Sequence, residues 1–219
     1  MIPIGDDNST RRTVPLVTYM LILVNLAVFW MEQVRGDQFI YTWSFTPSLF
    51  LSNPGVYWVT IFTSMFLHGG WMHIIGNMLF LWIFGDNVED RMGHLNFLIF
   101  YLLCGLAATM AQLFTTSSSN LSVPNLGASG AIAGVLASYL VMFPRQRVRV
   151  LMGVWVIPMS AFLVIGLWFG LQVLYVMGNA ADGVAYMAHV GGFIAGFVLT
   201  FFFRKREGPP QLPYNSSWQ

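Results

Sequence analysis

One serine lies in a setting that could make it a nucleophile. It belongs to the segment Gly127-Ala128-Ser129-Gly130, which follows Pro124 and opens a long apolar run. At the start of a helix the backbone amides lack acceptors and the helix dipole is positive, which suits a developing oxyanion. The flanking glycines would let another segment approach closely. The same pattern also fits a helix N-cap on a small-residue packing face, so the serine alone leaves catalysis open.

A histidine far along the chain could act as the base for this serine. His189 lies in an apolar run, and Gly192 and Gly196 lie near it on one helix face. The helix that begins at Ser129 carries glycines at the same spacing, which is typical of membrane helices whose backbones touch. If these faces meet, a neutral imidazole at His189 could accept the serine proton. Taken alone, the histidine also fits a bond to a backbone carbonyl or a proton relay in a transporter.

A second pair of polar residues could stabilise the oxyanion. His73 and Asn77 are four residues apart in an apolar run, so both point to the same side of a helix. Neither needs a charge to donate a hydrogen bond, and an oxyanion hole uses preorganised donors. The alternative is that they only join neighbouring helices. His68 lies just before this run, and we expect it to stabilise a loop.

No acidic residue is expected to complete a triad. A triad would need a carboxylate on the histidine. Asp182 precedes His189 by seven residues, roughly 10 Å along the axis of a helix. We therefore predict a dyad of Ser129 and His189. A zinc hydrolase is not indicated, because the chain has no H-E-x-x-H motif.

The elements that position these residues must be membrane helices. Hydrophobic residues make up 56% of the chain and charged residues 9%, whereas soluble domains carry about 25% charged residues. Lipid must therefore cover much of the surface. The net charge of +1 gives no indication of a nucleic-acid partner. Cys104 is the only cysteine, which excludes an intrachain disulfide.

Six apolar runs predict an all-α membrane protein with six transmembrane helices in one bundle. The catalytic domain is predicted at 14–203, between an N-terminal segment at 1–13 and a C-terminal tail at 204–219. A mixed segment at 32–68 is expected to be a long loop at the membrane interface, because it carries prolines and aromatic residues. The six runs cover roughly 14–31, 71–84, 94–114, 129–143, 150–177 and 184–203.

The distribution of basic residues predicts the orientation of this bundle. Six spans place both termini on one side of the membrane. Of the 10 Lys and Arg residues, only Arg35 then falls on the opposite side. The positive-inside rule therefore predicts that both termini are cytoplasmic. We expect a multi-pass protein of the cell membrane, and a prokaryotic plasma membrane in particular.

Taken together, these stretches resemble the rhomboid family of intramembrane serine proteases. The similarity runs from about residue 14 to 203, and the motifs occur in the same order and in the same spans. The matching segments are Phe66-Leu67-His68-Gly69-Gly70-Trp71-Met72-His73-Ile74-Ile75-Gly76-Asn77-Met78, Gly85-Asp86-Asn87-Val88-Glu89-Asp90, Gly127-Ala128-Ser129-Gly130-Ala131 and Ala188-His189-Val190-Gly191-Gly192.

The resemblance implies a role for each candidate residue. Ser129 would be the nucleophile and His189 the general base. Asn77, His73 and the Ser129 amide would bind the oxyanion. The family uses a water-accessible cavity that faces outward, and needs no metal or cofactor. Its partners are membrane-anchored protein substrates in the lipid bilayer, cut near the outer edge of their helix.

The chain departs from the family pattern in two places. Many members carry a Trp-Arg pair in the first outer loop, where this chain has Val59 and Thr60. That change puts in question how the loop is anchored. Some members place an aromatic residue four positions after the serine, stacked on the histidine. Ala133 occupies that position here, so His189 must find support elsewhere.

Two other classes of protein are alternatives to a protease. A rhomboid-like factor that binds and routes membrane helices typically lacks the serine or the histidine, and both are present here. A transporter with a histidine relay would need paired carboxylates within the membrane. Asp86, Glu89 and Asp90 all fall in one predicted cytoplasmic segment instead.

Overall fold

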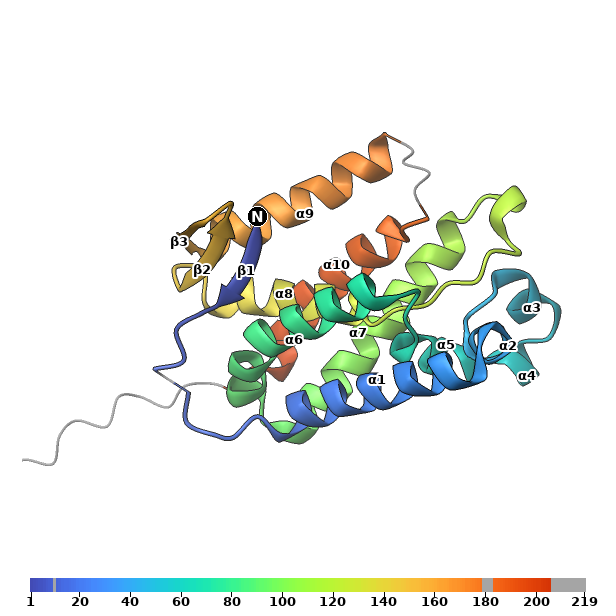
Figure 1. Cartoon of the computed structure of the whole chain (residues 1–219), viewed down its shortest axis with the longest axis horizontal. Coiled ribbons are helices and arrows are strands. Elements are labelled where there is room, and N and C mark those ends of the chain that lie inside the picture. The colour runs from blue at the N-terminus through green and yellow to red at the C-terminus, as the bar shows by residue number, and fades with distance from the viewer. Residues whose placement is uncertain (10, 179–182, 206–219) are drawn as a thin grey trace, which may run out of the picture.

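Long apolar helices form the body of the molecule, as the apolar runs predict. The computed structural model describes residues 1–9, 11–178 and 183–205. Among these residues, α1, α7 and α10 are long and apolar enough to cross a membrane by length and composition. The long helices of the bundle in Figure 1 are α1 (Leu16–Arg35), α6 (Trp71–Met92), α7 (His94–Thr115), α8 (Ser129–Met142), α9 (Ala161–Met177) and α10 (Tyr186–Phe203).

Small residues let α7, α8 and α10 pack with their backbones in contact. A Cβ atom on Gly192 would overlap the backbone carbonyl of Gly130, and one on Gly196 would overlap the backbone of Gly134. Ala108 of α7 lies against the same crossing, close to Gly130. The predicted contact between the two glycine faces is therefore confirmed. This contact fixes how closely the start of α8 can approach the start of α10.

The second predicted span ends later than expected. We predicted its end at Phe84, but α6 continues to Met92. The last turns of α6 carry acidic residues, and one of these caps the start of α1. The buried Glu89 carboxylate accepts hydrogen bonds from the backbone amides of Val17 and Thr18, at 2.9 and 2.7 Å. These amides lack acceptors because they lie in the first turn of α1, so the carboxylate both satisfies them and matches the helix dipole.

A small sheet replaces the start of the fifth predicted span, which corrects the all-α prediction. Residues 150–177 were predicted as one helix, but β2 (Arg147–Met152) and β3 (Trp155–Ser160) form an antiparallel hairpin before α9. β1 (Ile2–Gly5) pairs with the other edge of β2. Val148 and Val150 are buried while Arg147 and Arg149 are exposed. This period-two alternation is typical of a strand, and most of it lies before the apolar run predicted at 150–177.

The segment predicted as a long interfacial loop is a chain of short helices. Figure 1 shows it at one end of the bundle, opposite the sheet. Phe45 of this segment forms an isolated bridge with Asn125, and the Gly127 amide donates to the Ser64 carbonyl at 2.8 Å. These bonds hold the extended segment that leads to Ser129. The elements are α2 (Asp37–Trp43), α3 (Pro47–Ser52), α4 (Pro54–Tyr57), α5 (Thr60–Thr63) and η1 (Ser64–Phe66). A further short helix, η2 (Ser118–Asn120), lies much later in the chain, between α7 and α8.

The N-terminal segment is tied to the sheet end of the bundle by polar side chains. Asp6 Oδ2 accepts hydrogen bonds from Tyr139 Oη at 2.6 Å and from Asn87 Nδ2 at 2.8 Å. Arg11 forms an ion pair with Asp86 at 2.7 Å. Burial, which outweighs the Tyr139 hydrogen bond, raises the pKa of Asp6 to about 6. Of the predicted tail at 204–219, only the first two residues are described.

The raised pKa of Asp6 predicts a pH-dependent contribution to stability. The folded protein keeps the Asp6 proton to a higher pH than the unfolded chain does. The stability that this difference supplies is full below about pH 4 and is lost as the pH rises through about 6. Asp6→Asn removes the buried charge and should therefore raise the unfolding midpoint relative to the unchanged protein at pH 7.5, by about 2–4 °C. At pH 4.5 the two midpoints should converge.

Thermal unfolding in detergent at both pH values measures this difference. Asp7→Asn is the matched control, because Asp7 is exposed and its pKa is lowered by the Ser9 amide. An Asp6→Asn advantage that is equal at both pH values would contradict the assignment.

Candidate active site

Ser129 is held at the first residue of α8 by the bend before it. Gly127 has φ +130°, a conformation that L side chains rarely adopt. A Cβ atom at Gly127 would also lie 2.9 Å from His73 Cε1, so the backbone passes directly over that ring. Ala128 is fully buried and precedes the helix. The serine hydroxyl and the free amides of the first helical turn therefore face the same space as His73.

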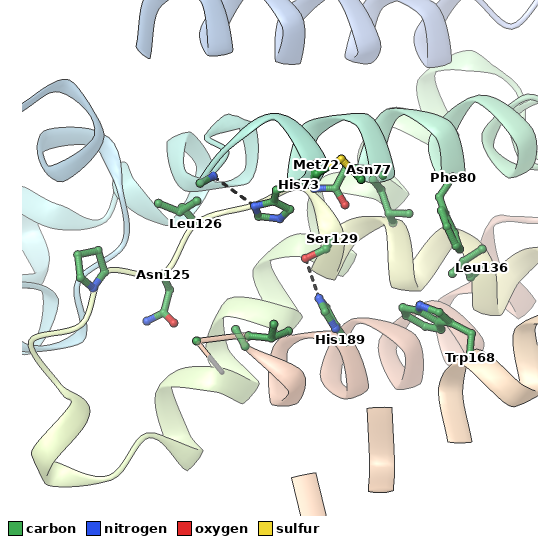
Figure 2. Close-up of a pocket in the computed structure, with 17 residues that line it drawn as sticks. Met72, His73, Asn77, Phe80, Asn125, Leu126, Ser129, Leu136, Trp168 and His189 are labelled. Carbon is green, nitrogen blue, oxygen red and sulfur yellow. Dashed lines mark hydrogen bonds between the residues drawn. The ribbon is translucent and has the colours of Figure 1, made fainter. Parts of the chain in front are cut away.

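The structure brings His189 and Ser129 together, although they are 60 residues apart in the chain. His189 lies in the first turn of α10, and its Nε2 is 2.8 Å from Ser129 Oγ. Figure 2 shows the two side chains facing each other across the gap between their helices. The distance is that of a normal hydrogen bond between a hydroxyl and an imidazole nitrogen. This is the geometry that proton transfer from the serine requires.

The opposite edge of the histidine ring is supported by residues that the sequence analysis did not identify. His189 Nδ1 is 2.7 Å from Oε1 of Gln172, a residue of α9 that is 7% exposed. The rings of Trp168 and Tyr186 lie 5.9 and 6.2 Å from the imidazole, measured between centroids. These contacts supply the support that Ala133 cannot give. A polar side chain in the middle of an apolar helix is the signal that could have pointed to Gln172.

His73 and Asn77 lie on the same side of α6, as their spacing predicts, and they line the cavity on the other side of the serine from His189 (Figure 2). The Gly69 amide donates to His73 Nδ1 at 3.2 Å. A neutral ring then carries its proton on Nε2, which is the nitrogen nearer Gly127. Asn77 is 8% exposed, and its buried Nδ2 finds no hydrogen-bond partner among the described residues. An unsatisfied buried donor costs free energy, so its place beside the serine suits a ligand oxygen.

One cavity of about 510 Å³ is lined by all four predicted site residues, Ser129, His189, His73 and Asn77. Its walls come from α6, α8, α9, α10 and the segment before Ser129 (Figure 2). One part of the lining is apolar, with the side chains of Met72, Phe80, Ile132, Leu136 and Trp168. The cavity can therefore hold an extended apolar peptide segment, and the polar side chains of the site can contact the backbone of that segment.

The remaining candidates lie elsewhere or outside the described part of the chain. Asp182 falls among the residues that the structure does not describe. His68 is buried in the loop before α6, where its backbone amide donates to Glu32 at 3.0 Å. Burial lowers the pKa of His68 to about 4, so this ring is neutral at physiological pH. Thr60, at one of the two departure positions, is buried, and its hydroxyl donates to the Tyr57 carbonyl at 2.6 Å.

The arrangement contains the parts needed for acyl transfer. A hydroxyl is paired with an imidazole, and donors from α6 and α8 converge on the same space. Within 1–9, 11–178 and 183–205, no group of three or more His, Cys, Asp or Glu side chains is arranged to hold a metal ion. Cys104 is buried in the core. The groups proposed for chemistry at the cavity are the hydroxyl and backbone amide of Ser129, the imidazoles of His73 and His189, and the side-chain amide of Asn77.

Comparisons with known proteins point to one family. A family profile described as "Rhomboid domain" matches residues 55–206. The chain is 27% identical over 197 residues to Rhomboid protein 1, mitochondrial, of Saccharomyces cerevisiae, covering 86% of this chain and 54% of the relative. It is 30% identical over 197 residues to Rhomboid-like protein 11, chloroplastic, of Arabidopsis thaliana, covering 85% of this chain and 65% of the relative.

A bacterial relative matches over nearly its full length. The chain is 28% identical over 202 residues to Putative rhomboid protease YdcA of Bacillus subtilis, covering 90% of this chain and 92% of that protein. Against the yeast and plant relatives the chain spans less than two thirds of their length.

Proposed function

The chain belongs to the rhomboid family, and on that premise we propose that it is an intramembrane serine endopeptidase acting through a dyad of Ser129 and His189. The family includes relatives named as proteases, which supports protease function at the level of the family. The observation that carries the proposal for this chain is the 2.8 Å contact between His189 Nε2 and Ser129 Oγ.

The reaction proceeds through an acyl-enzyme. His189 Nε2 takes the Ser129 proton as the hydroxyl oxygen attacks the carbonyl carbon of the scissile bond. The carbonyl oxygen becomes an oxyanion, which accepts hydrogen bonds from the Asn77 amide, His73 Nε2–H and the Ser129 backbone amide. His189 then gives its proton to the leaving amine. A water molecule then attacks the acyl carbon while His189 Nε2 takes its proton. His189 returns this proton to Ser129 Oγ as the acyl bond breaks, which releases the new carboxylate and restores the serine.

The proposed substrate class follows from membership of the family. The substrates are membrane-anchored proteins, cut near the outer edge of their transmembrane helix. A substrate segment must be unwound for its carbonyl to reach the serine, and unpaired backbone is tolerated at membrane depth only in a protein-lined cavity. The segment enters between α6 and α9. Six helices cross the bilayer, with both termini cytoplasmic, in a prokaryotic plasma membrane.

A second candidate is a non-catalytic factor that binds and routes membrane helices. It would use the same cavity and the same substrates. Such a factor would not need a hydroxyl paired with an imidazole. The contact between Ser129 and His189 therefore favours a protease.

Labelling with a fluorophosphonate separates these functions, because the probe forms a covalent bond only with an activated serine. We expect the purified protein in detergent to be labelled, with no change when a chelator is added. Labelling should disappear when Ser129 is replaced with alanine. An unlabelled protein that still binds a single-span substrate would support the binding factor, and labelling abolished by chelators would contradict the dyad.

A further inference from the structure

The one amide side chain of α9 faces the histidine of the site. Gln172 lies in the apolar sequence Phe169-Gly170-Leu171-Gln172-Val173-Leu174 and is 7% exposed. A buried polar side chain among apolar residues costs free energy unless it is hydrogen-bonded. Gln172 satisfies both ends of its amide, and one of its two partners is His189. The cost of burying it is therefore offset at the site itself.

The hydrogen bonds of Gln172 establish which way its amide points. Its Nε2 donates to the Trp168 carbonyl, one helical turn earlier, at 3.2 Å. Its Oε1 therefore faces His189 Nδ1, at 2.7 Å. A carbonyl oxygen can only accept, so Nδ1 must carry the ring proton. The other nitrogen, Nε2, is then free to accept the proton of Ser129.

We infer that Gln172 is a positioning residue, which fixes the tautomer and the ring orientation of His189 so that Nε2 faces Ser129. The inference rests on the function proposed above. In a triad a carboxylate does this work. Here a neutral amide holds the same nitrogen without adding a charge to the membrane interior, where a charge is costly.

The position of α9 determines whether this support is in place. Gln172 and Trp168 both belong to α9, and both contact His189 of α10. The two helices are also joined by Phe169 and Phe193, whose rings stack with centroids 4.0 Å apart. The orientation of His189 therefore depends on α9 remaining packed against α10.

Gln172→Leu tests the inference through the rate of the chemical step. Leucine suits an apolar helix but cannot accept from Nδ1–H, so the ring loses the bond that fixes its tautomer. We expect kcat for a single-span substrate to fall about 10-fold with little change in KM. Leu171→Ala is the matched control, because Leu171 is the neighbour of Gln172 in α9 but is 49% exposed, so the substitution leaves the contacts of His189 in place. It should leave kcat within about twofold of the unchanged protein.

Gln172→Glu provides a readout that a merely structural role would not move. A carboxylate accepts from the same Nδ1–H, so activity should return. It also favours the protonated ring, so the acidic limb of the pH–rate profile should shift upward by about 1–2 pH units. Equal kcat in Gln172→Leu and the unchanged protein, or a restored kcat with no shift of the profile, would overturn the inference. Failure of the proposed function is a different result, since the unchanged protein would then show no Ser129-dependent cleavage at all.

Discussion

Replacing Ser129 with alanine is expected to lower the cleavage of a single-span substrate by about 10⁴-fold or more. The alanine side chain has no oxygen to attack the carbonyl, and His189 then has no proton to accept from it. The cavity and the oxyanion donors remain, so substrate binding should be preserved. The measurement is the cleavage rate of a tagged substrate reconstituted with each variant in lipid vesicles.

Two controls make this result specific to the dyad. Ser138→Ala removes a hydroxyl from the same helix, where Ser138 Oγ is buried and has no hydrogen-bond partner among the described residues. It should leave the rate unchanged. Adding His189→Ala to Ser129→Ala should cause no further loss, because residues that act as one unit are not additive. A Ser129→Ala protein that retains substantial activity would contradict the account.

Adding one methyl group at Gly192 is expected to have the largest effect on stability. In Gly192→Ala the new Cβ atom would overlap the carbonyl oxygen of Gly130, which is backbone and cannot rotate away. The helices α8 and α10 must then separate. Overpacking of this kind costs about 1–3 kcal/mol or more. The separation also lengthens the contact between His189 and Ser129, so cleavage should fall together with the unfolding midpoint.

Gly166→Ala provides the matched control for this variant. A Cβ atom at Gly166 would meet nothing within 4 Å, although the residue lies in an equally apolar helix. Its cleavage rate should match that of the unchanged protein, and its unfolding midpoint in detergent should be no lower, because alanine favours a helix more than glycine does. If Gly192→Ala were as stable and as active as Gly166→Ala, the close contact of α8 and α10 would not be what positions the dyad.

The residues of the site could be found in the sequence because polar groups are rare in apolar helices. Ser129, His189, His73 and Asn77 stand out for this reason, and glycines four residues apart show which helix faces can touch. These are local signals, and the geometry brings the four residues to one cavity. Their chemical roles stay predictions.

Other features depend on contacts that no local pattern reveals. Gln172 carried the same signal of a polar residue in an apolar run, but it lay within a stretch predicted as one long span. That stretch begins as the hairpin of β2 and β3, and β1, more than 140 residues earlier, pairs with the other edge of β2. Likewise, Glu89 belongs to a helix and not to a loop because its carboxylate caps α1. Tertiary pairing determined both outcomes.

The most direct test of the dyad is to locate the fluorophosphonate adduct by mass spectrometry of the labelled protein. We expect one phosphonylated peptide, modified at Ser129, whose formation falls sharply when His189 is replaced with alanine. An adduct on another serine, or full labelling of Ser129 without the histidine, would contradict it.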